Sequence, residues 1–422
     1  MAAPLRSTLH QGVLLAQLSL GLTLAVAHAT AAQSANRSEP ARPAPSIPLQ
    51  FEEARVYVPV RVPLGASGVA DRWFILDTGA QPTLLDVALA DSMKVRVTSA
   101  GMTTGAGRGS TRVGNAGPLT LDVSGIPLGP ITVRVAPLDS LLGATSGRGI
   151  PGVIGSRFFR EHVVTLDFDS LVMHANDPST FSPPRDAIVV PLDVEGDIPY
   201  ARGWLTIPDG RRVPMRLLVD LGAKSTLLLT EPFVHAQRLE SAFPTRVENP
   251  LGAGMGGPTR YAFARAPLLE VATSQTPLRL PEALVGLSVG GTLRSAQYDA
   301  LLGADFLARY RVTFDYARRV MYLRPRPRTL PRAELDMSGM YLMSDRAAQR
   351  IIVEEVRPRS PASAAGVRPG DVLLALDGRP MGEMSLAAVR AVLRSRDGRV
   401  VRLVLARGGV ARDVVLTLRR VI

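Results

Sequence analysis

The stretch that decides the fold is Phe74–Ala80, FILDTGA, an apolar run that stops at an acid, a hydroxyl and two of the smallest residues. An apolar run of this kind indicates a buried strand, and Asp-Thr-Gly directly after it places a carboxylate at a tight turn that leaves the core. A similar stretch, Leu217–Ala223 with the sequence LLVDLGA, returns 143 residues later. The repeat predicts two acid-bearing turns in one chain, and two carboxylates brought together by a repeat are a candidate catalytic pair.

The residues around the first acid predict a hairpin that delivers it. Valine alternates with other residues over 55–63, and a glycine-containing loop at 64–70 leads into the run that ends at Asp77. Residues 84–92 are a helix candidate. Short apolar runs separated by turn signals then predict strands, and Gly152–Phe159 is typical of a strand that breaks into a short helix.

The same order of elements returns after a proline- and serine-rich joint at 178–186. Thr83–Leu85 matches Thr226–Leu228 at the offset of 143, whereas Val153–Phe168 matches Leu301–Tyr316 at an offset of 148. The offset is constant within each block, so a short insertion lies between the blocks, where exposed loops tolerate it. This pattern indicates an internal duplication.

Taken together, these motifs resemble the retropepsin-like aspartic proteases over about residues 50–325. The resemblance implies a mainly β fold with two β-barrel halves in tandem, residues 50–180 and 187–325. It also implies that Asp77 and Asp220 form the catalytic dyad within one chain, so that the dyad is monomeric. No metal ion and no cofactor are expected. The substrate would be a protein or peptide, cleaved by a water molecule that the two acids activate through one shared proton.

The resemblance also assigns supporting roles to the residues after each acid, which are Thr78, Gly79, Ala80, Leu221, Gly222 and Ala223. Leu221 departs from the family pattern, which has a hydroxyl at this position. Thr78 can still bond to the N–H of Leu221 and the carbonyl of Val219, but we expect the reciprocal pair to be lost. Two glycine-rich segments, 101–109 and 252–257, fall where the family has the flaps that close over a substrate; an ordinary flexible loop is the alternative interpretation.

The last part of the chain, residues 336–422, resembles a PDZ domain of the rearranged type found in exported bacterial proteases. Ser360–Asp371 and the Asp377-Gly378 turn carry the resemblance, which implies an α+β fold. In that family a loop before a strand binds the terminal carboxylate of a peptide, which then pairs with the strand. The matching residues are Gly339, Met340, Tyr341 and Leu342, and a helix at 385–394 forms the other wall of the groove. A terminal or internal peptide is the expected ligand; a merely bracing role is the alternative.

Composition sets further limits. Apolar residues make up 46% and charged residues 20%, which is typical of a globular protein of more than one domain. The net charge of +12 comes almost entirely from scattered arginines, since Lys94 and Lys224 are the two lysines, so we do not expect a nucleic-acid partner. The chain has no cysteine, and its five histidines show no zinc-binding spacing.

The N-terminus predicts export. A basic residue, a short apolar stretch and a small-residue ending at 27–31 describe a signal peptide over residues 1–31, followed by a flexible linker over 32–49. We therefore expect a bacterial protein that is periplasmic or secreted, without a membrane span once the signal is removed; an uncleaved signal that serves as an anchor is the alternative.

Two functions from different classes fit these observations. One is an exported aspartic endopeptidase with a PDZ domain that recruits or regulates. The other is a non-catalytic peptide-binding or scaffold protein, in which the protease fold is kept and Leu221 marks a site that no longer does chemistry.

Overall fold

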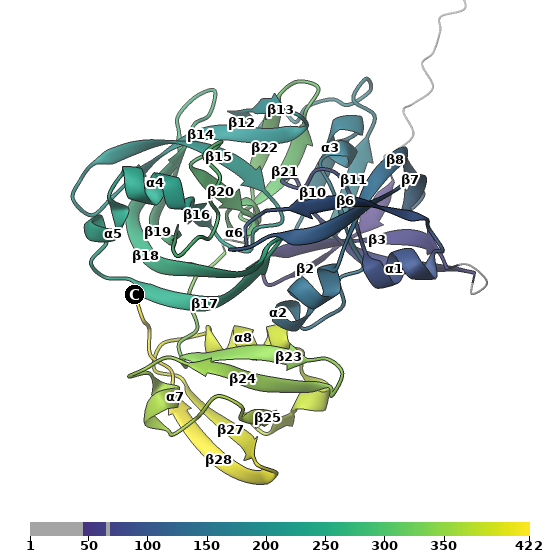
Figure 1. Cartoon of the computed structure of the whole chain (residues 1–422). Helices are drawn as coiled ribbons and strands as arrows, with labels where there is room; N and C mark the ends of the chain where they lie inside the picture. Colours follow the sequence, from purple (N-terminus) through teal and green to yellow (C-terminus); the bar gives the residue numbers. More distant parts are fainter. Residues whose placement is uncertain (1–44, 65–67, 329) are drawn as a thin grey trace, which may run out of the picture. The chain divides into compact units, whose positions relative to one another are not determined.

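The computed structural model describes residues 45–64, 68–328 and 330–422 (Figure 1). The predicted signal peptide and residues 32–44 of the predicted linker lie outside the described residues. The end of the linker prediction is wrong, because Ser46–Pro48 form strand β1 at the edge of a sheet. Ile47 and Leu49 are buried there, so their apolar side chains hold this segment on the core, and an edge strand tolerates Pro48.

The first half is an eight-stranded sheet with the order β2-β3-β4-β9-β5-β8-β7-β6. Strand β3 also pairs with β7, which closes the sheet into a barrel. The strands are β2 (Gln50–Glu52), β3 (Arg55–Pro63), β4 (Val69–Leu76), β5 (Leu84–Asp86), β6 (Val97–Thr103), β7 (Thr111–Val123), β8 (Ile126–Ala136) and β9 (Gly152–Ile154). The predicted hairpin is present as β3 and β4, and it ends directly before Asp77.

The helices of the first half are short: α1 (Val87–Ser92), the π-helical turn η2 (Asp139–Gly143), α2 (Ala144–Ser146) and α3 (Arg157–Glu161). The helix predicted over 84–92 is wrong in its first turn, because Leu84 and Leu85 are buried and pair with β8 as part of β5. Asp86 ends that strand and caps α1 by accepting a hydrogen bond from the N–H of Ala88.

The second half repeats the first, with the sheet order β13-β14-β15-β20-β16-β19-β18-β17 and closure between β14 and β18. Its strands are β13 (Asp193–Glu195), β14 (Ile198–Thr206), β15 (Arg212–Asp220), β16 (Leu227–Leu229), β17 (Val247–Gly254), β18 (Gly257–Val271), β19 (Leu278–Ser288) and β20 (Ala300–Gly303). Its helices are α4 (Glu231–Ala236), α5 (Leu239–Ala242) and α6 (Ala304–Leu307). In Figure 1 the first half is purple to blue and the second half is teal to green.

A six-stranded sheet joins the halves in the order β1-β11-β10-β21-β22-β12. The added strands are β10 (Val163–Asp167), β11 (Val172–Asn176), β12 (Ile188–Pro191), β21 (Tyr310–Asp315) and β22 (Val320–Pro325). At its centre β10 pairs with β21, and the hydroxyls of Thr165 and Thr313 lie 2.8 Å apart. These two threonines are equivalent in the repeat, so the pseudo-twofold axis that relates the halves passes between them.

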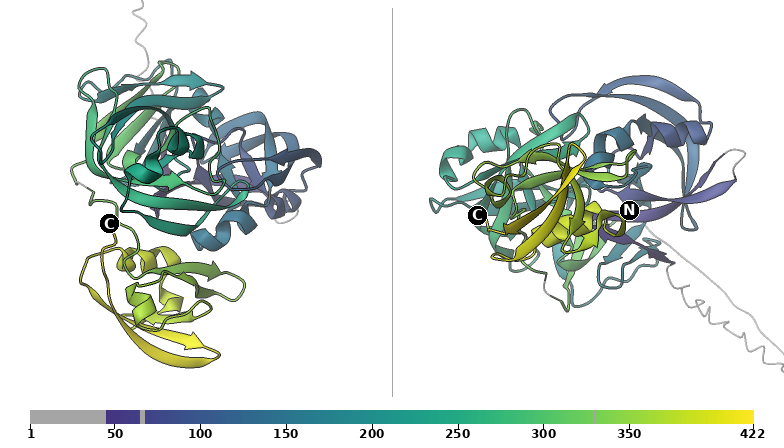
Figure 2. Two further views of the ribbon diagram at one scale, coloured as in Figure 1. Left: turned by 60° about the vertical axis from the view of Figure 1, so that its left-hand side comes forward. Right: turned by 90° about the horizontal axis from the view of Figure 1, so that it is seen from below.

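The C-terminal domain has its own sheet, β23-β24-β25-β27-β28, with β26 beside β25, and a separate apolar core (Figure 2). Its elements are β23 (Met340–Asp345), β24 (Arg350–Val356), α7 (Pro361–Ala364), β25 (Val372–Leu376), β26 (Arg379–Pro380), the 3-10 turn η3 (Met381–Glu383), α8 (Leu386–Leu393), β27 (Val400–Arg407) and β28 (Val410–Thr417). Ser360 and Ser385 cap α7 and α8, as expected for a small-residue turn and a helix at these positions.

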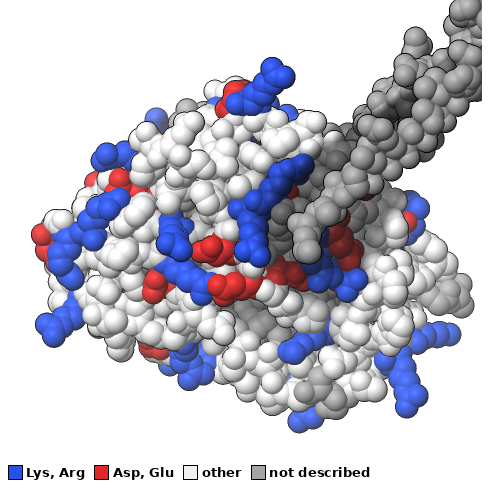
Figure 3. Space-filling model, turned by 90° about the horizontal axis from the view of Figure 1, so that it is seen from above, with Lys and Arg blue, Asp and Glu red and all other residues white. Residues whose placement is uncertain are grey.

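Charged side chains are spread over the surface. On the face in Figure 3, lysines and arginines are interspersed with acids, and no basic stripe that could follow a nucleic-acid backbone is visible on that face. Within the part of the chain that the structure describes, every helix is too short or too polar to cross a bilayer.

Candidate active site

The two acid-bearing turns meet at the interface between the barrels. Asp77 follows β4 and Asp220 ends β15, and their carboxyl groups lie close enough that each changes the pKa of the other. Each carboxyl also accepts a hydrogen bond from the glycine N–H two residues later, over 2.7 Å from Gly79 to Asp77 and 2.8 Å from Gly222 to Asp220. The fold therefore brings together the two acids that the repeat singles out.

Each carboxyl packs against the glycine of the opposite turn. A Cβ atom on Gly222 would lie 2.3 Å from Oδ2 of Asp77, and one on Gly79 would lie 3.1 Å from Cγ of Asp220. The first distance is far below a van der Waals contact, so a side chain at Gly222 would push the two acids apart. These glycines are needed for close approach and not for an unusual backbone angle.

The residues beneath the dyad are asymmetric. The Thr78 hydroxyl donates to the carbonyl of Val219 over 2.6 Å and accepts from the N–H of Leu221 over 3.0 Å. Leu221 has no hydroxyl to return these bonds, and its side chain is fully buried in the main core. Thr78 is therefore the side chain through which the two turns hold each other.

Both loops are fixed to the start of a helix in the same way. The carbonyl of Ala80 accepts from the N–H of Ser156, before α3, and the carbonyl of Ala223 accepts from the N–H of Ala304, in α6, each over 2.9 Å. These bonds explain why a Gly-containing apolar run and a helix start occur near the end of each half in the sequence.

Burial and charge set the protonation of the pair. Burial raises the pKa of Asp220 well above its usual range, and the charge of Asp77 raises it further. Burial also raises the pKa of Asp77, but hydrogen bonds from Asp220 and from the Gly79 N–H, and the charge of Arg55, oppose that rise. Because two adjacent carboxyls cannot both ionise cheaply, the pair is expected to share one proton.

Arg55 is a site residue that the sequence analysis missed. It begins β3, is 6% exposed and donates from Nη1 to the hydroxyl of Ser146 over 2.7 Å. Its equivalent in the second half is Ile198, the first residue of β14. This difference between the halves, a cation in the first and an apolar residue in the second, is the feature of the sequence that could have identified Arg55.

The dyad lies in a cleft of about 1420 Å³. Two hairpins, β6–β7 and β17–β18, cover it, and their tips meet through backbone bonds from Gly107 to the carbonyl of Met255 (2.8 Å) and from Gly109 to the carbonyl of Gly256 (2.9 Å). The two glycine-rich segments of the sequence thus belong to paired flaps. A Cβ atom on Gly107 would lie 2.3 Å from the carbonyl carbon of Gly256, so the tips can meet only through glycine.

The two walls of the cleft differ. Aliphatic side chains from the first half form one apolar cluster, which includes Leu84, Leu138 and Val153. The corresponding cluster of the second half includes Tyr200 and Tyr261, with Tyr298 packed against it. Burial raises the pKa of both Tyr261 and Tyr298 above the usual range. Tyr298 raises the pKa of Tyr261 further, and Asp220 raises that of Tyr298, so both hydroxyls stay protonated. The two halves therefore present different surfaces to the cleft on either side of the two acids.

The residues expected to bind a peptide in the C-terminal domain are buried and already bonded. The N–H of Gly339 donates to Asp336 (2.8 Å), and the N–H of Met340 donates to the Ser338 hydroxyl (3.0 Å). The predicted groove residues Met340, Tyr341 and Leu342 are each at most 6% exposed. The Tyr341 hydroxyl donates to the carbonyl of Glu248 in β17, and Arg390 of α8 donates to the carbonyl of Leu342.

The described residues contain no cluster of three or more acids or histidines of the kind that holds a metal ion. The site accordingly offers two coupled carboxyls, a covered cleft and a nearby cation. This set of groups can hold a water molecule between an ionised and a protonated acid.

Fold and site together define an aspartyl-protease domain joined to a PDZ domain. A family model described as aspartyl protease matches residues 58–158, and one described as PDZ domain matches residues 352–407. The chain therefore contains a retropepsin-like aspartyl-protease domain in its N-terminal half and a PDZ domain near its C-terminus, which confirms the resemblance seen in the sequence.

Among curated proteins, the chain is similar to the magnetosome formation protease MamE of Magnetospirillum gryphiswaldense, at 42% identity over 64 residues. It is also similar to the protein of the same name from Paramagnetospirillum magneticum, at 39% identity over 66 residues. These matches cover 15% and 16% of this chain but 8% and 9% of the relatives, so the chain spans less than a tenth of their length. A solved structure, basic 7S globulin from soybean, aligns with 66% of this chain and 94% of its own at 11% identity and a TM-score of 0.40.

Proposed function

We propose that this protein is an aspartic endopeptidase that cleaves peptide bonds with Asp77 and Asp220. The observation that carries the proposal is the pair of adjacent carboxyls, each packed against the glycine of the opposite turn, in a cleft that two flaps cover. A structural role alone would not require two half-buried acids to face each other, because placing like charges together without a function costs stability.

The proposed reaction divides the work between the two acids. Asp77, which Arg55 helps to keep ionised, accepts a proton from a water molecule that lies between the carboxyls, and this water attacks the carbonyl carbon of the scissile bond. Asp220 donates its proton to the carbonyl oxygen at the same step. Asp77 then returns the proton to the leaving amine as the C–N bond breaks, and Asp220 is reprotonated from the resulting diol, so atoms and charges balance.

The scaffold alternative rests on Leu221, the departure from the family pattern. The hydrogen bond from the Leu221 N–H to the Thr78 hydroxyl supports the enzymatic function, since the bonds of Thr78 alone are enough to hold the two acid-bearing turns together. We further propose that the protein acts outside the cytoplasm on protein or peptide substrates, with the C-terminal domain forming part of the cleft wall through Tyr341 and Arg390.

The test is cleavage of an unfolded protein by the chain without residues 1–31, across about pH 3 to 7, where a pair with one shared proton is expected to work. We expect fragments that mass spectrometry detects, inhibition by pepstatin, and loss of cleavage in Asp77→Asn. Fragments that form equally well with Asp77→Asn would point to a contaminating protease. No cleavage of diverse substrates over this range would contradict the proposal.

A further inference from the structure

The pseudo-twofold axis gives the cleft two equivalent ends, and their residues differ in charge. At one end the turn Glu53-Ala54 joins β2 to β3, and at the other end Gly196-Asp197 joins β13 to β14. Each turn lies beside the dyad loop of the opposite half. Lys224 of the second dyad loop contacts Glu53, and its equivalent Gln81 of the first loop approaches Gly196.

Glu53 occupies a backbone position that suits glycine. Its φ is 49°, in the left-handed region, and Ala54 after it has a φ of 55°. The equivalent residue in the other half is Gly196, with a φ of 55°. A non-glycine residue is disfavoured in this region, so a glutamate here indicates that its side chain is needed.

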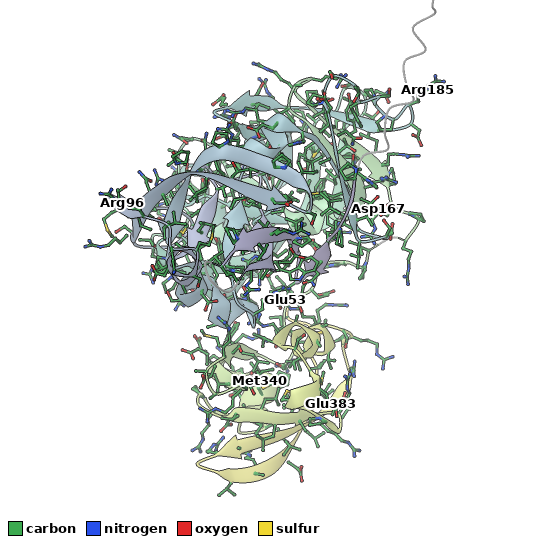
Figure 4. The ribbon with its side chains drawn as sticks, turned by 90° about the vertical axis from the view of Figure 1, so that its right-hand side faces the viewer. Glu53, Arg96, Asp167, Arg185, Met340 and Glu383 are labelled. Atoms are coloured by element: carbon green, nitrogen blue, oxygen red, sulfur yellow. The ribbon has the colours of Figure 1, made fainter. Side chains whose placement is uncertain are left out.

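Several cations surround Glu53, whose position is labelled in Figure 4. Oε2 of Glu53 lies 3.2 Å from Nζ of Lys224 and 2.8 Å from Nη1 of Arg390, and Oε1 lies 3.9 Å from Nη2 of Arg394. Arg55 is close enough to Lys224 to repel it. Two further acids are nearby: Asp336 already accepts the N–H groups of Ser338 and Gly339, and Asp77 interacts with the charge of Arg55.

Two polar atoms in this cluster have no hydrogen-bond partner among the described residues. They are Nε of Arg55, a residue 6% exposed, and Oε1 of Glu53. Both residues line the cleft. A buried guanidinium N–H without an acceptor leaves the positive charge of Arg55 only partly compensated, which favours an anion in the neighbouring part of the cleft. At the other end, Gln81 and Ile198 are neutral, and Asp197 is paired with Arg160 at 3.0 Å.

We propose that the Glu53 end of the cleft is a subsite for a carboxylate of the substrate, recognised by Lys224 and Arg394 with Arg55 behind them. The Lys224 and Arg394 side chains are 29% and 43% exposed, so both can reach a ligand in the cleft. The inference rests on the proposed peptide cleavage, and it gives that cleavage a direction, because the two ends of the cleft are no longer equivalent.

The position of the subsite predicts where the carboxylate lies. Lys224 follows Asp220 by four residues, which span at most about 14 Å when extended. An extended substrate rises about 3.3 Å per residue, so the carboxylate lies within about four residues of the scissile bond. Its source is either an acidic side chain or the C-terminal carboxylate of a short peptide, which share the same chemistry.

The experiment uses fluorescent peptides that share one cleaved sequence and differ only in the position of a carboxylate. One series has Glu or Gln at each of the first four positions on either side of the scissile bond. A second series ends there with a free or an amidated C-terminus. Binding to Asp220→Asn is measured by anisotropy, and kcat/KM is measured with the protein that keeps both acids.

We expect one side to favour the carboxylate by about tenfold, which is the size of one charge-assisted contact in a partly buried site. Lys224→Met and Arg394→Gln should each reduce that preference, whereas Gln81→Met, the matched change at the other end, should keep the ratio. Arg394→Gln is the safer variant for folding because its side chain is the more exposed, and thermal unfolding of each variant checks this.

The outcomes separate the two proposals. Carboxylate-dependent binding to Asp220→Asn without any cleavage by the unchanged protein would support the subsite and contradict the enzyme. Cleavage without a carboxylate preference, or a preference that Lys224→Met and Arg394→Gln leave unchanged, would overturn the subsite and leave the enzyme standing. Preference in the Glu/Gln series alone assigns an acidic side chain, and preference in the free/amidated series alone assigns a chain terminus.

Discussion

Thr78 is the side chain whose removal should do most damage beneath the dyad. Thr78→Val keeps the shape of the residue but leaves the carbonyl of Val219 without a donor and the N–H of Leu221 without an acceptor, both in the core. Each buried unpaired group costs about 1 to 3 kcal/mol, so we expect a loss of about 2 to 6 kcal/mol in the free energy of unfolding. Because Leu221 has no hydroxyl, no equivalent side chain beneath the acids can replace the lost hydrogen bonds of Thr78.

The assay is urea unfolding of the chain near neutral pH, followed through the Trp73 and Trp204 fluorescence of the two barrels, with kcat/KM measured in parallel. The matched control is Thr98→Val, which removes an exposed hydroxyl that donates to the carbonyl of Asn115 over 3.3 Å and should change stability by less than about 0.5 kcal/mol. If Thr78→Val unfolds within that margin of the control and retains kcat/KM, the two turns do not hold each other through Thr78.

Three further predictions concern charge and the flaps. Burial raises the pKa of Glu53, but the charges of Lys224, Arg390 and Arg394 outweigh burial and lower this pKa from 4.5 to about 2. The ionised carboxylate therefore stabilises the fold above about pH 4.5, and this stabilisation is lost as the pH falls towards 2. The gap in unfolding free energy between wild type and Glu53→Gln should thus shrink by up to about 3 kcal/mol between pH 5 and 2, and a gap independent of pH would contradict the ion pairs. The charge of Arg55 lowers the pKa of Asp77, so Arg55→Met should move the acidic side of the pH profile of kcat/KM to higher pH. Arg72 is exposed, and Arg72→Met is the control that should leave the profile in place. A profile that neither variant moves would exclude Arg55 from the site. Gly107→Ala places a methyl group 2.3 Å from the carbonyl carbon of Gly256 and should lower kcat/KM about tenfold to a hundredfold. The control is Gly382→Ala, whose methyl group meets no atom within 4 Å and should leave kcat/KM unchanged. Equal kcat/KM values of the two variants would show that the flap tips need not meet.

The sequence predicts the local parts of this fold well. The hairpin that ends at Asp77, its repeat at Asp220 and the capped helix at 385–394 depend on patterns within about twenty residues, and the structure has all of them. The helix predicted over 84–92 fails in its first turn because the pairing of Leu84 and Leu85 with β8, some fifty residues away, outweighs local preference.

Non-local features could not be predicted in this way. The central pairing of β10 with β21 joins strands 148 residues apart, and no local pattern specifies it. The cluster of Glu53, Lys224 and Arg390 comes from three distant segments, so only two weak signals mark it in the sequence. One is a glutamate where the repeat has Gly196, and the other is that Lys224 is one of two lysines in an arginine-rich chain.

The central claim is that Asp77 and Asp220 act as one unit, and the kcat/KM values of Asp77→Asn, Asp220→Asn and the double variant test it most directly. If the two acids share one proton and one water molecule, each single variant should lose about as much activity as the double variant, because residues that act as a unit are not additive. A single variant that retains activity close to wild type, or losses that multiply in the double variant, would contradict the account.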